Sequence, residues 1–297
     1  MNKKYHFSTG RYGKYITAFF AATMFILLSS LQPEPEKALL WRIEKETVAA
    51  PSYLFGTIHI IEKDKYYFPE YMQECFEACD ALVTEILIDI PLKDQLAMAQ
   101  RMVLPANKTY KDYLSDEDFE RLKNNIVDSL DIKEKKFERY IRIKPVYLSS
   151  LILSEMLKKP TAYEQNLTKE AKKLSLELLA LETLYEQLDI LESLPDEEVF
   201  SYFSEDYDLL QEYNGLINKY LEQDIHAIYN TIQEEESIND FESQLLSERN
   251  QRWLPVLDSL MTKKSCFIAV GAGHLSGGKG ILNLLKEQGY KISPVTH

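Results

Sequence analysis

The chain has 297 residues, a formal net charge of −13 at pH 7 and an apolar fraction of 45%, with 11% aromatic residues. A chain of this length and composition is globular and forms one sizeable α/β domain or two small ones. The acidic charge argues against binding nucleic acid through phosphates, so we expect no nucleic-acid partner. Three cysteines without a paired zinc spacing supply neither a disulfide framework nor a structural zinc site.

Residues 1–32 have the pattern of an export signal. Four basic residues and no acidic residue are followed by an apolar run from Ile16 to Leu28. This run is short for a membrane-spanning helix and typical of a signal peptide. No clean small-x-small cleavage site follows it, so an uncleaved membrane anchor remains an alternative. We expect a periplasmic or extracellular protein, with any membrane attachment through this segment only.

The first structured part of the chain contains a glycine–histidine motif between two strands. After a Pro- and Glu-containing linker, the alternation over residues 38–45 predicts a half-exposed strand. A second strand over residues 52–55 leads into Gly56-x-x-His59, and a helix over residues 69–79 precedes an apolar strand over residues 81–86. Glu85 stands in this apolar strand. A carboxylate there is costly to bury, so it either serves a site or meets an arginine at the end of the strand.

The middle of the chain is dominated by helical periodicity. No glycine occurs between Gly56 and Gly215. Ser115 is expected to cap a helix, and further helices are expected over 93–103, 134–141, 146–158, 165–178, 186–193, 196–203 and 206–220. One short apolar stretch, residues 178–184, predicts a strand that ends at Glu182, much as the earlier strand ends at Glu85.

The last part of the chain repeats the first motif. A helix that contains Arg249 is followed by the apolar run 266–270, which is typical of a buried parallel strand. Gly271-Ala-Gly-His274 ends this strand, and a helix over residues 279–288 and a strand over residues 290–295 follow. Pro255 predicts a kink or a boundary in the preceding helix.

We therefore expect an α/β fold with a central, largely parallel or mixed sheet. It is built from two strand–Gly-x-x-His–helix–strand halves, with a large helical insertion between them. The expected domain covers residues 33–297, with a core over about 38–90 and 241–297 and the insertion over about 91–240. His59 and His274 converge only if their two strands lie near each other in the sheet, which is the central structural prediction.

The ordered set of motifs resembles the TraB/GumN family, which includes the Tiki-type proteases. The resemblance covers about residues 36–297. It rests on the two Gly-x-x-His motifs and Glu85, and it extends through Lys144-Pro145, Leu181–Leu188, Ser247–Asn250 and the closing strand. The family's middle motif reads Ala162-Tyr163-Glu164 here, with alanine in place of glycine, so no role is assigned to Glu164.

Two histidines and a glutamate form a three-ligand set for a catalytic divalent metal with one position left for water. His59, Glu85 and His274 are the expected ligands, and these donors leave zinc, manganese and cobalt open. The resemblance implies hydrolysis of a peptide or protein substrate, with Arg249 as a further site residue. Arg249 either holds a substrate carboxylate or oxyanion, or pairs with Glu85 or Glu182.

Three alternatives remain open from the sequence. The histidines could act without a metal, one as a general base and the other as an orienting group. The same cleft could bind a peptide, haem or a metal without turnover. The acidic helices could also serve a periplasmic scaffold that meets a protein partner.

Overall fold

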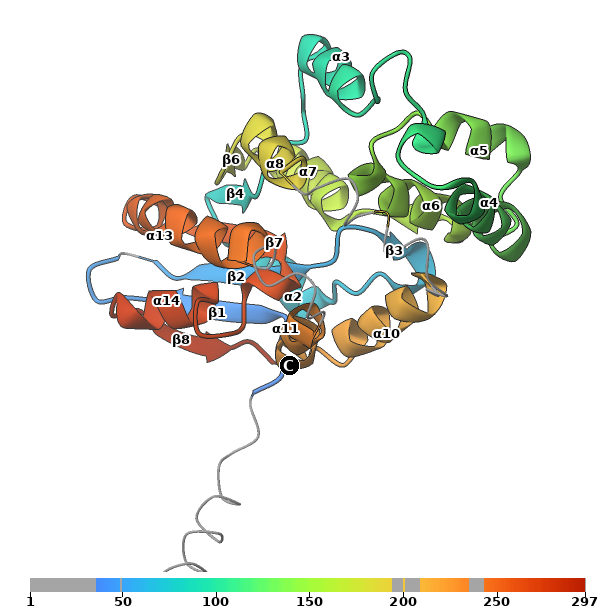
Figure 1. Cartoon of the computed structure of the whole chain (residues 1–297). Helices are drawn as coiled ribbons and strands as arrows, with labels where there is room; N and C mark the ends of the chain where they lie inside the picture. Colours follow the sequence, from blue (N-terminus) through green and yellow to red (C-terminus); the bar gives the residue numbers. More distant parts are fainter. Residues whose placement is uncertain (1–35, 49, 194–199, 201–208, 235–242, 297) are drawn as a thin grey trace, which may run out of the picture. The chain divides into compact units, whose positions relative to one another are not determined.

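The computed structural model describes residues 36–48, 50–193, 200, 209–234 and 243–296. Contacts between residues divide the chain into two units, Met1–Glu36 and Lys37–His297, and the second unit carries the fold in Figure 1. The expected export segment, the helix expected over residues 196–203 apart from Phe200, and His297 lie outside the described residues.

A six-stranded sheet in the order β6-β4-β7-β2-β1-β8 forms the centre of this unit. Strand β7 pairs in parallel with β2 and β4, and β4 pairs in parallel with β6, whereas β1 runs antiparallel to β2 and β8. This mixed, largely parallel sheet confirms the expected fold class. Its strands are β1 Leu40–Glu44, β2 Ser52–Thr57, β4 Ala81–Thr84, β6 Glu177–Ala180, β7 Cys266–Gly271 and β8 Lys291–Pro294.

Two strand–helix–strand units contribute their strands to this sheet. The first consists of β2, α2 (Glu70–Glu77) and β4, and the second of β7, α14 (Ile281–Glu287) and β8. From β2 to β4 the chain moves one way along the strand order, and from β7 to β8 it moves the other way. Right-handed crossovers in opposite directions place their helices, α2 and α14, on opposite faces of the sheet. Figure 1 shows α14 beside α13 (Glu248–Met261) over one face. Toward α2, Phe267 of β7 packs against Phe76 with ring centroids 5.0 Å apart.

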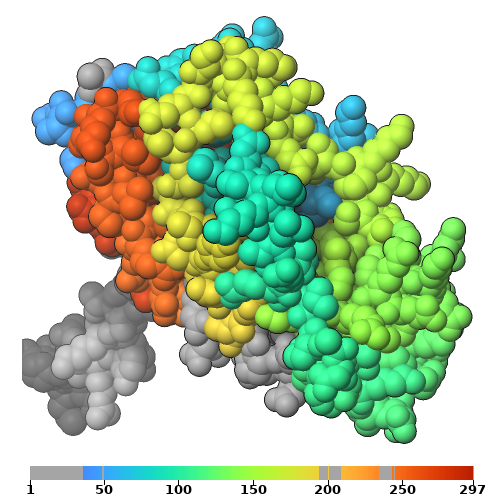
Figure 2. Space-filling model, turned by 90° about the horizontal axis from the view of Figure 1, so that it is seen from above, coloured from blue at the N-terminus to red at the C-terminus, as the bar shows by residue number. Residues whose placement is uncertain are grey.

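Residues 91–240 supply most of the helices and one strand of the central sheet. Helices α4, α5 and α6 share a second hydrophobic cluster that includes Phe119, Phe137 and Ile152, whereas β6 extends the central sheet next to β4. Figure 2 shows α3 lying beside α8, to which Arg101 of α3 is tied by ion pairs with Asp189 and Glu192. The helices are α3 Leu92–Arg101, α4 Asp116–Asn124, α5 Glu134–Tyr140, α6 Leu148–Met156, α7 Tyr163–Leu174, α8 Leu184–Leu191, α10 Leu209–Leu221 and α11 Ile225–Glu234.

Short elements connect these parts. Strands β3 (Ile61–Glu62) and β5 (Pro160–Thr161) form a separate two-stranded sheet. The 3-10 turns are η1 Lys63–Lys65, η2 Tyr110–Asp112, η4 Pro145–Tyr147 and η7 Ala272–His274, and the π-helical turns are η3 Asn125–Ser129 and η6 Ser243–Ser247.

Most of the local sequence signals hold. Ser115 caps α4 as expected, since its Oγ accepts a hydrogen bond from the Asp118 amide. The three cysteines are free. Of the kink or boundary expected at Pro255, the boundary is wrong, because α13 continues through this residue to Met261. Burial of Trp253, Leu257 and Met261 along the helix outweighs the one backbone hydrogen bond that a proline removes. Within the described ranges, no helix combines the length and apolar character that a membrane span requires.

Candidate functional site

The two Gly-x-x-His motifs start within one residue of each other along the paired strands β2 and β7. Strands β2 and β7 are parallel neighbours, and Thr57 at the end of β2 is paired with Gly271 at the end of β7. His59 and His274 therefore both follow the carboxyl ends of their strands, His274 within the turn η7. The carboxyl edge of parallel strands is where α/β sheets commonly bind ligands.

Gly271 leaves open a space that three polar side chains border. A Cβ atom at Gly271 would lie 3.4 Å from Oε1 of Glu85, 3.6 Å from Cδ2 of His274 and 3.8 Å from Nε2 of His59. Glu85 directly follows β4, the other neighbour of β7, and its Oε1 accepts a hydrogen bond from the Gly271 amide at 2.8 Å. Two imidazoles and one carboxylate therefore meet around a single backbone position.

Arg249 links Glu85 to a second carboxylate, Glu182. Its Nη2 donates to Oε2 of Glu85 at 2.5 Å and to Oε1 of Glu182 at 2.6 Å. Its Nε donates to Oε2 of Glu182 at 3.2 Å. All three side chains are at most 6% exposed. One guanidinium thus neutralises only one of the two negative charges of these buried carboxylates. The negative charge that remains is costly to bury unless a further cation offsets it.

Two neighbours complete the hydrogen bonding of these carboxylates. Gln187 of α8 donates through Nε2 to Glu85 at 3.1 Å and to Glu182 at 3.3 Å. Trp253 donates through Nε1 to Glu182 at 3.2 Å, and the Arg249 guanidinium lies 4.6 Å from the centre of its ring. Planar stacking and forked donation are properties of arginine that lysine lacks. The pairing alternative considered for Arg249 is therefore the one that the structure contains, with both glutamates.

Glu85 remains ionised despite its burial. Burial alone would raise its pKa, but His274, His59, Arg249 and the Gly271 amide together lower the pKa to about 2. Because His274 is itself neutral at pH 7, the positive charges that keep this carboxyl ionised are those of His59 and of the Arg249 guanidinium.

His274 is held in one tautomer. Nη1 of Arg249 lies 3.2 Å from its Nε2, and a guanidinium can only donate, so Nε2 is the acceptor. The proton is therefore on Nδ1, which donates to Oδ1 of Asn250 at 2.7 Å. The Asn250 amide nitrogen donates to the carbonyls of His274 and Lys279, which fixes this orientation. Burial, reinforced by Arg249, lowers the pKa of His274 to about 3 and keeps the imidazole neutral.

The pKa of His59 is shifted in the opposite direction to that of His274. Its Nδ1 lies 3.3 Å from Oε1 of Glu164, and Oγ1 of Thr57 donates to the same oxygen at 2.8 Å. Glu164 raises the pKa of His59, to about 9. The His59 side chain is 70% exposed, so water screens its interaction with Glu164. The carboxylate orients the ring, and Nε2 is left to face the space at Gly271.

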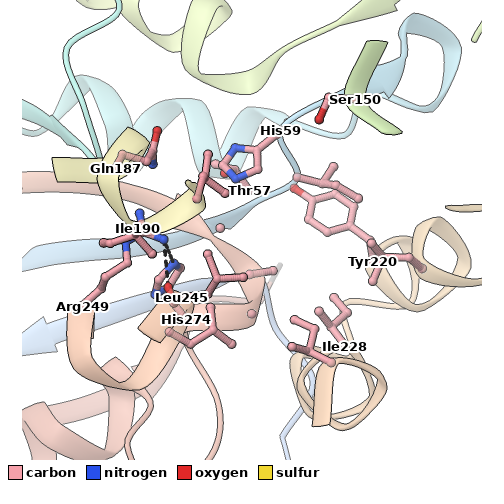
Figure 3. A pocket seen from close by; sticks show the side chains of 18 residues that line it. Thr57, His59, Ser150, Gln187, Ile190, Tyr220, Ile228, Leu245, Arg249 and His274 are labelled. Atoms are coloured by element: carbon pink, nitrogen blue, oxygen red, sulfur yellow. Dashed lines mark hydrogen bonds between the residues drawn. The ribbon is translucent and has the colours of Figure 1, made fainter. Parts of the chain in front are cut away.

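A cavity of about 490 Å³ opens from this space. Figure 3 shows Arg249 next to His274 and across from His59 and Gln187, with Tyr220 and Ile228 on a further side. A smaller hollow of about 210 Å³ is lined by Glu85, Glu164 and Gln187 among others, and His59 borders both cavities.

The donor set suits a divalent cation. Neutral His274, with its Nδ1 bound to an amide oxygen, has the tautomer and outer partner of a metal ligand. A cation would also offset the excess negative charge of the two carboxylates. Across the described ranges, however, no group of three or more His, Cys, Asp or Glu side chains is arranged so that it could hold a metal ion without rearrangement. Arg249 takes Nε2 of His274 and one oxygen of Glu85, so His274 would exchange that contact for the ion.

The four residues singled out from the sequence, His59, Glu85, Arg249 and His274, lie together in the structure. Four further members of the same network were not assigned a role: Glu164, Glu182, Gln187 and Asn250. Glu182 carried a signal, since it follows a short apolar strand as Glu85 does. Glu164 also carried a sequence signal, because it is the acidic residue of the middle motif. Alanine at position 162 of that motif, in place of the expected glycine, obscured the signal.

The chain matches the TraB/PrgY/gumN family over residues 39–294 and belongs to it.

The curated relatives that it resembles include metalloproteases. It is 23% identical to the metalloproteases TIKI1 and TIKI2 of Danio rerio, each over 86% of this chain and over 62% and 60% of the relative, respectively. It is 25% identical to a metalloprotease TIKI homolog of Amphimedon queenslandica, over 87% of this chain and 61% of the relative. The chain thus spans about three fifths of the length of these relatives. No solved structure matches it.

Proposed function

We propose that this protein is an exported, metal-dependent hydrolase that cleaves amide or ester bonds of peptide-like substrates. The observation that carries the proposal is the meeting of His59, Glu85 and His274 around Gly271. Membership of the family and the metalloprotease names of the relatives support the same reaction class.

The side chains that would hold the metal are His59, His274 and Glu85. The chemistry that a divalent ion would supply there is a lowered pKa of a water molecule and polarisation of a substrate carbonyl group. Zinc, manganese and cobalt all suit imidazole and carboxylate ligands.

Each of these residues is prepared for its role by a neighbour. Asn250 holds the proton of His274 at Nδ1 and leaves the lone pair of Nε2 free of a proton. Arg249 and the Gly271 amide keep Glu85 ionised and fix its two oxygens. Glu164 holds Nδ1 of His59, so His59 gains or loses its other proton at Nε2, which faces the same space. A metal-free variant of the reaction would use this proton exchange at His59, with the ring acting as a general base once it has lost the proton at Nε2.

A second candidate function is binding of a peptide, haem or metal in the same cavity without turnover. The apolar side of the cavity favours it, because holding a ligand there requires no reactive group.

The test is metal content together with cleavage of a peptide mixture. The purified full-length chain is stripped with a chelator, reloaded separately with manganese, cobalt and zinc, and incubated with the mixture, with new termini detected by mass spectrometry. We expect about one equivalent of metal and cleavage in the wild type, and the loss of both in His274→Ala and Glu85→Gln. His226→Ala is the matched control, since His226 contacts Ser276 instead of this site.

The outcomes separate the two candidates. Bound metal or peptide without new termini under any of the three metals would replace the hydrolase with the binding protein. Cleavage that persists after chelation would retain the hydrolase and assign the chemistry to the histidines alone. Export is tested separately by locating the protein in fractionated cells and sequencing its amino terminus.

A further inference from the structure

One side of the large cavity is an apolar chamber formed by Leu216, Ile228, Ile232, Leu245 and Leu246. These residues come from three elements that follow one another in the chain, α10, α11 and η6. Ile228 and Leu246 are almost fully buried, whereas Leu216, Ile232 and Leu245 are half-buried and line the opening. The apolar side chains of these elements thus line a cavity instead of packing directly against one another.

The chamber adjoins the turn that carries His274. A Cβ atom at Gly273 would lie 2.7 Å from Cδ1 of Ile232 and 3.7 Å from both Cδ atoms of Leu246. The residue before His274 therefore touches the chamber wall directly. A group that fills the chamber lies within about one residue of the space bordered by the two histidines.

The described residues of the chamber offer no charge to a ligand. Besides the two histidines, Arg249 is the charged side chain among the described residues that line the cavity. Its guanidinium is already bound to Glu85 and Glu182. An acidic or basic side chain in the chamber would lose its hydration without gaining a partner, which is costly.

Building on the hydrolase function proposed above, we infer that this chamber is a specificity subsite. It binds a large, uncharged apolar side chain of the substrate, such as leucine, methionine or phenylalanine, next to the bond that is cleaved. The cavity of about 490 Å³ is within the range of roughly 300–1,000 Å³ that is usual for ligand pockets. The substrate class is thus a peptide with an apolar residue at one position beside the cleaved bond and no charge there.

The test uses a charge placed in the chamber and the same charge placed outside it. Leu216→Asp puts a carboxylate at the half-buried opening of the chamber. Leu221→Asp is the matched control on the same helix, because Leu221 is 42% exposed and does not line the cavity. The full-length, metal-loaded protein and both variants are incubated with a peptide mixture that contains all residues equally at each position.

In the wild type we expect cleaved bonds to show apolar residues on one side, favoured over charged residues by roughly 10- to 200-fold. Leu216→Asp is expected to abolish this preference and to raise cleavage beside lysine and arginine, a gain that misfolding cannot produce. Leu221→Asp is expected to keep the wild-type profile. Cleavage without an apolar preference on either side, or an unchanged profile in Leu216→Asp, overturns the inference while the hydrolase function stands.

A binding measurement separates failure of the subsite from failure of the enzyme. Calorimetric titration with a leucine-containing pentapeptide and its aspartate analogue needs no turnover. Binding of the leucine peptide that is lost in Leu216→Asp, without cleavage, supports the subsite and overturns the hydrolase. No binding of the leucine peptide up to about 1 mM, or equal binding of the two peptides, overturns the subsite.

Discussion

Replacing Arg249 with methionine tests whether the buried charge network holds the site together. Methionine replaces the apolar stem of arginine with an unbranched apolar side chain, but it leaves Glu85 and Glu182 buried without their shared cation. Removing one partner of a buried ion pair typically costs about 3–5 kcal/mol. We therefore expect the free energy of unfolding to fall by about 3 kcal/mol at pH 7.

The pH dependence of this loss has a definite sign. In the wild type the pKa of Glu85 is lowered by folding, so its stabilisation is complete above pH 4.5 and is lost as the pH falls toward 2. Without Arg249 the buried carboxyl has a raised pKa and binds a proton in the folded state before the unfolded one. The difference in stability between wild type and Arg249→Met is therefore expected to shrink as the pH falls from 7 to 4.

Urea unfolding at several pH values, followed by circular dichroism, measures both effects. Arg252→Met is the matched control, because Arg252 is exposed on the same helix and its replacement should change stability by no more than about 0.5 kcal/mol. A loss below about 1 kcal/mol in Arg249→Met at pH 7, or a loss that grows on acidification, would refute the stabilising role of Arg249 between the two carboxylates.

Three further predictions concern the histidines, the glycine between them and the core. The imidazole of His59 is expected to titrate above its ordinary value of 6.5 in the metal-free protein and to return toward it in Glu164→Gln, as observed by NMR titration; equal titration in both proteins would contradict the pairing. Gly271→Ala is expected to change the free energy of unfolding by less than about 1 kcal/mol, since the new Cβ makes only ordinary contacts. The same Cβ fills the space between Glu85, His274 and His59, so the affinity for metal is expected to fall at least about tenfold. Unchanged metal affinity in calorimetry would show that the metal binds elsewhere. Phe267→Ala is expected to cost about 3–5 kcal/mol in urea unfolding, because this fully buried ring packs against three other phenylalanines; a cost near zero would contradict its central place in the core.

The sequence by itself determined the elements and the two halves of the fold. Apolar runs predicted the strands that became β2, β4 and β7, and helical periodicity predicted most of the helices, because both signals arise from which faces of a short segment are buried. The glycines of the two motifs marked the strand ends, so His59 and His274 could be placed at the edge of the sheet before their neighbours were known. The boundary expected at Pro255 failed because packing of the whole helix outweighed a local preference.

Only the tertiary structure decided which partners these residues meet. Glu164 reaches the site through Thr57, 107 residues away, and Glu182 reaches Arg249 across 67 residues. Such contacts depend on the order of strands in the sheet and on the packing of helices around it. Periodicity and capping act over a few residues and carry no information about partners so far apart.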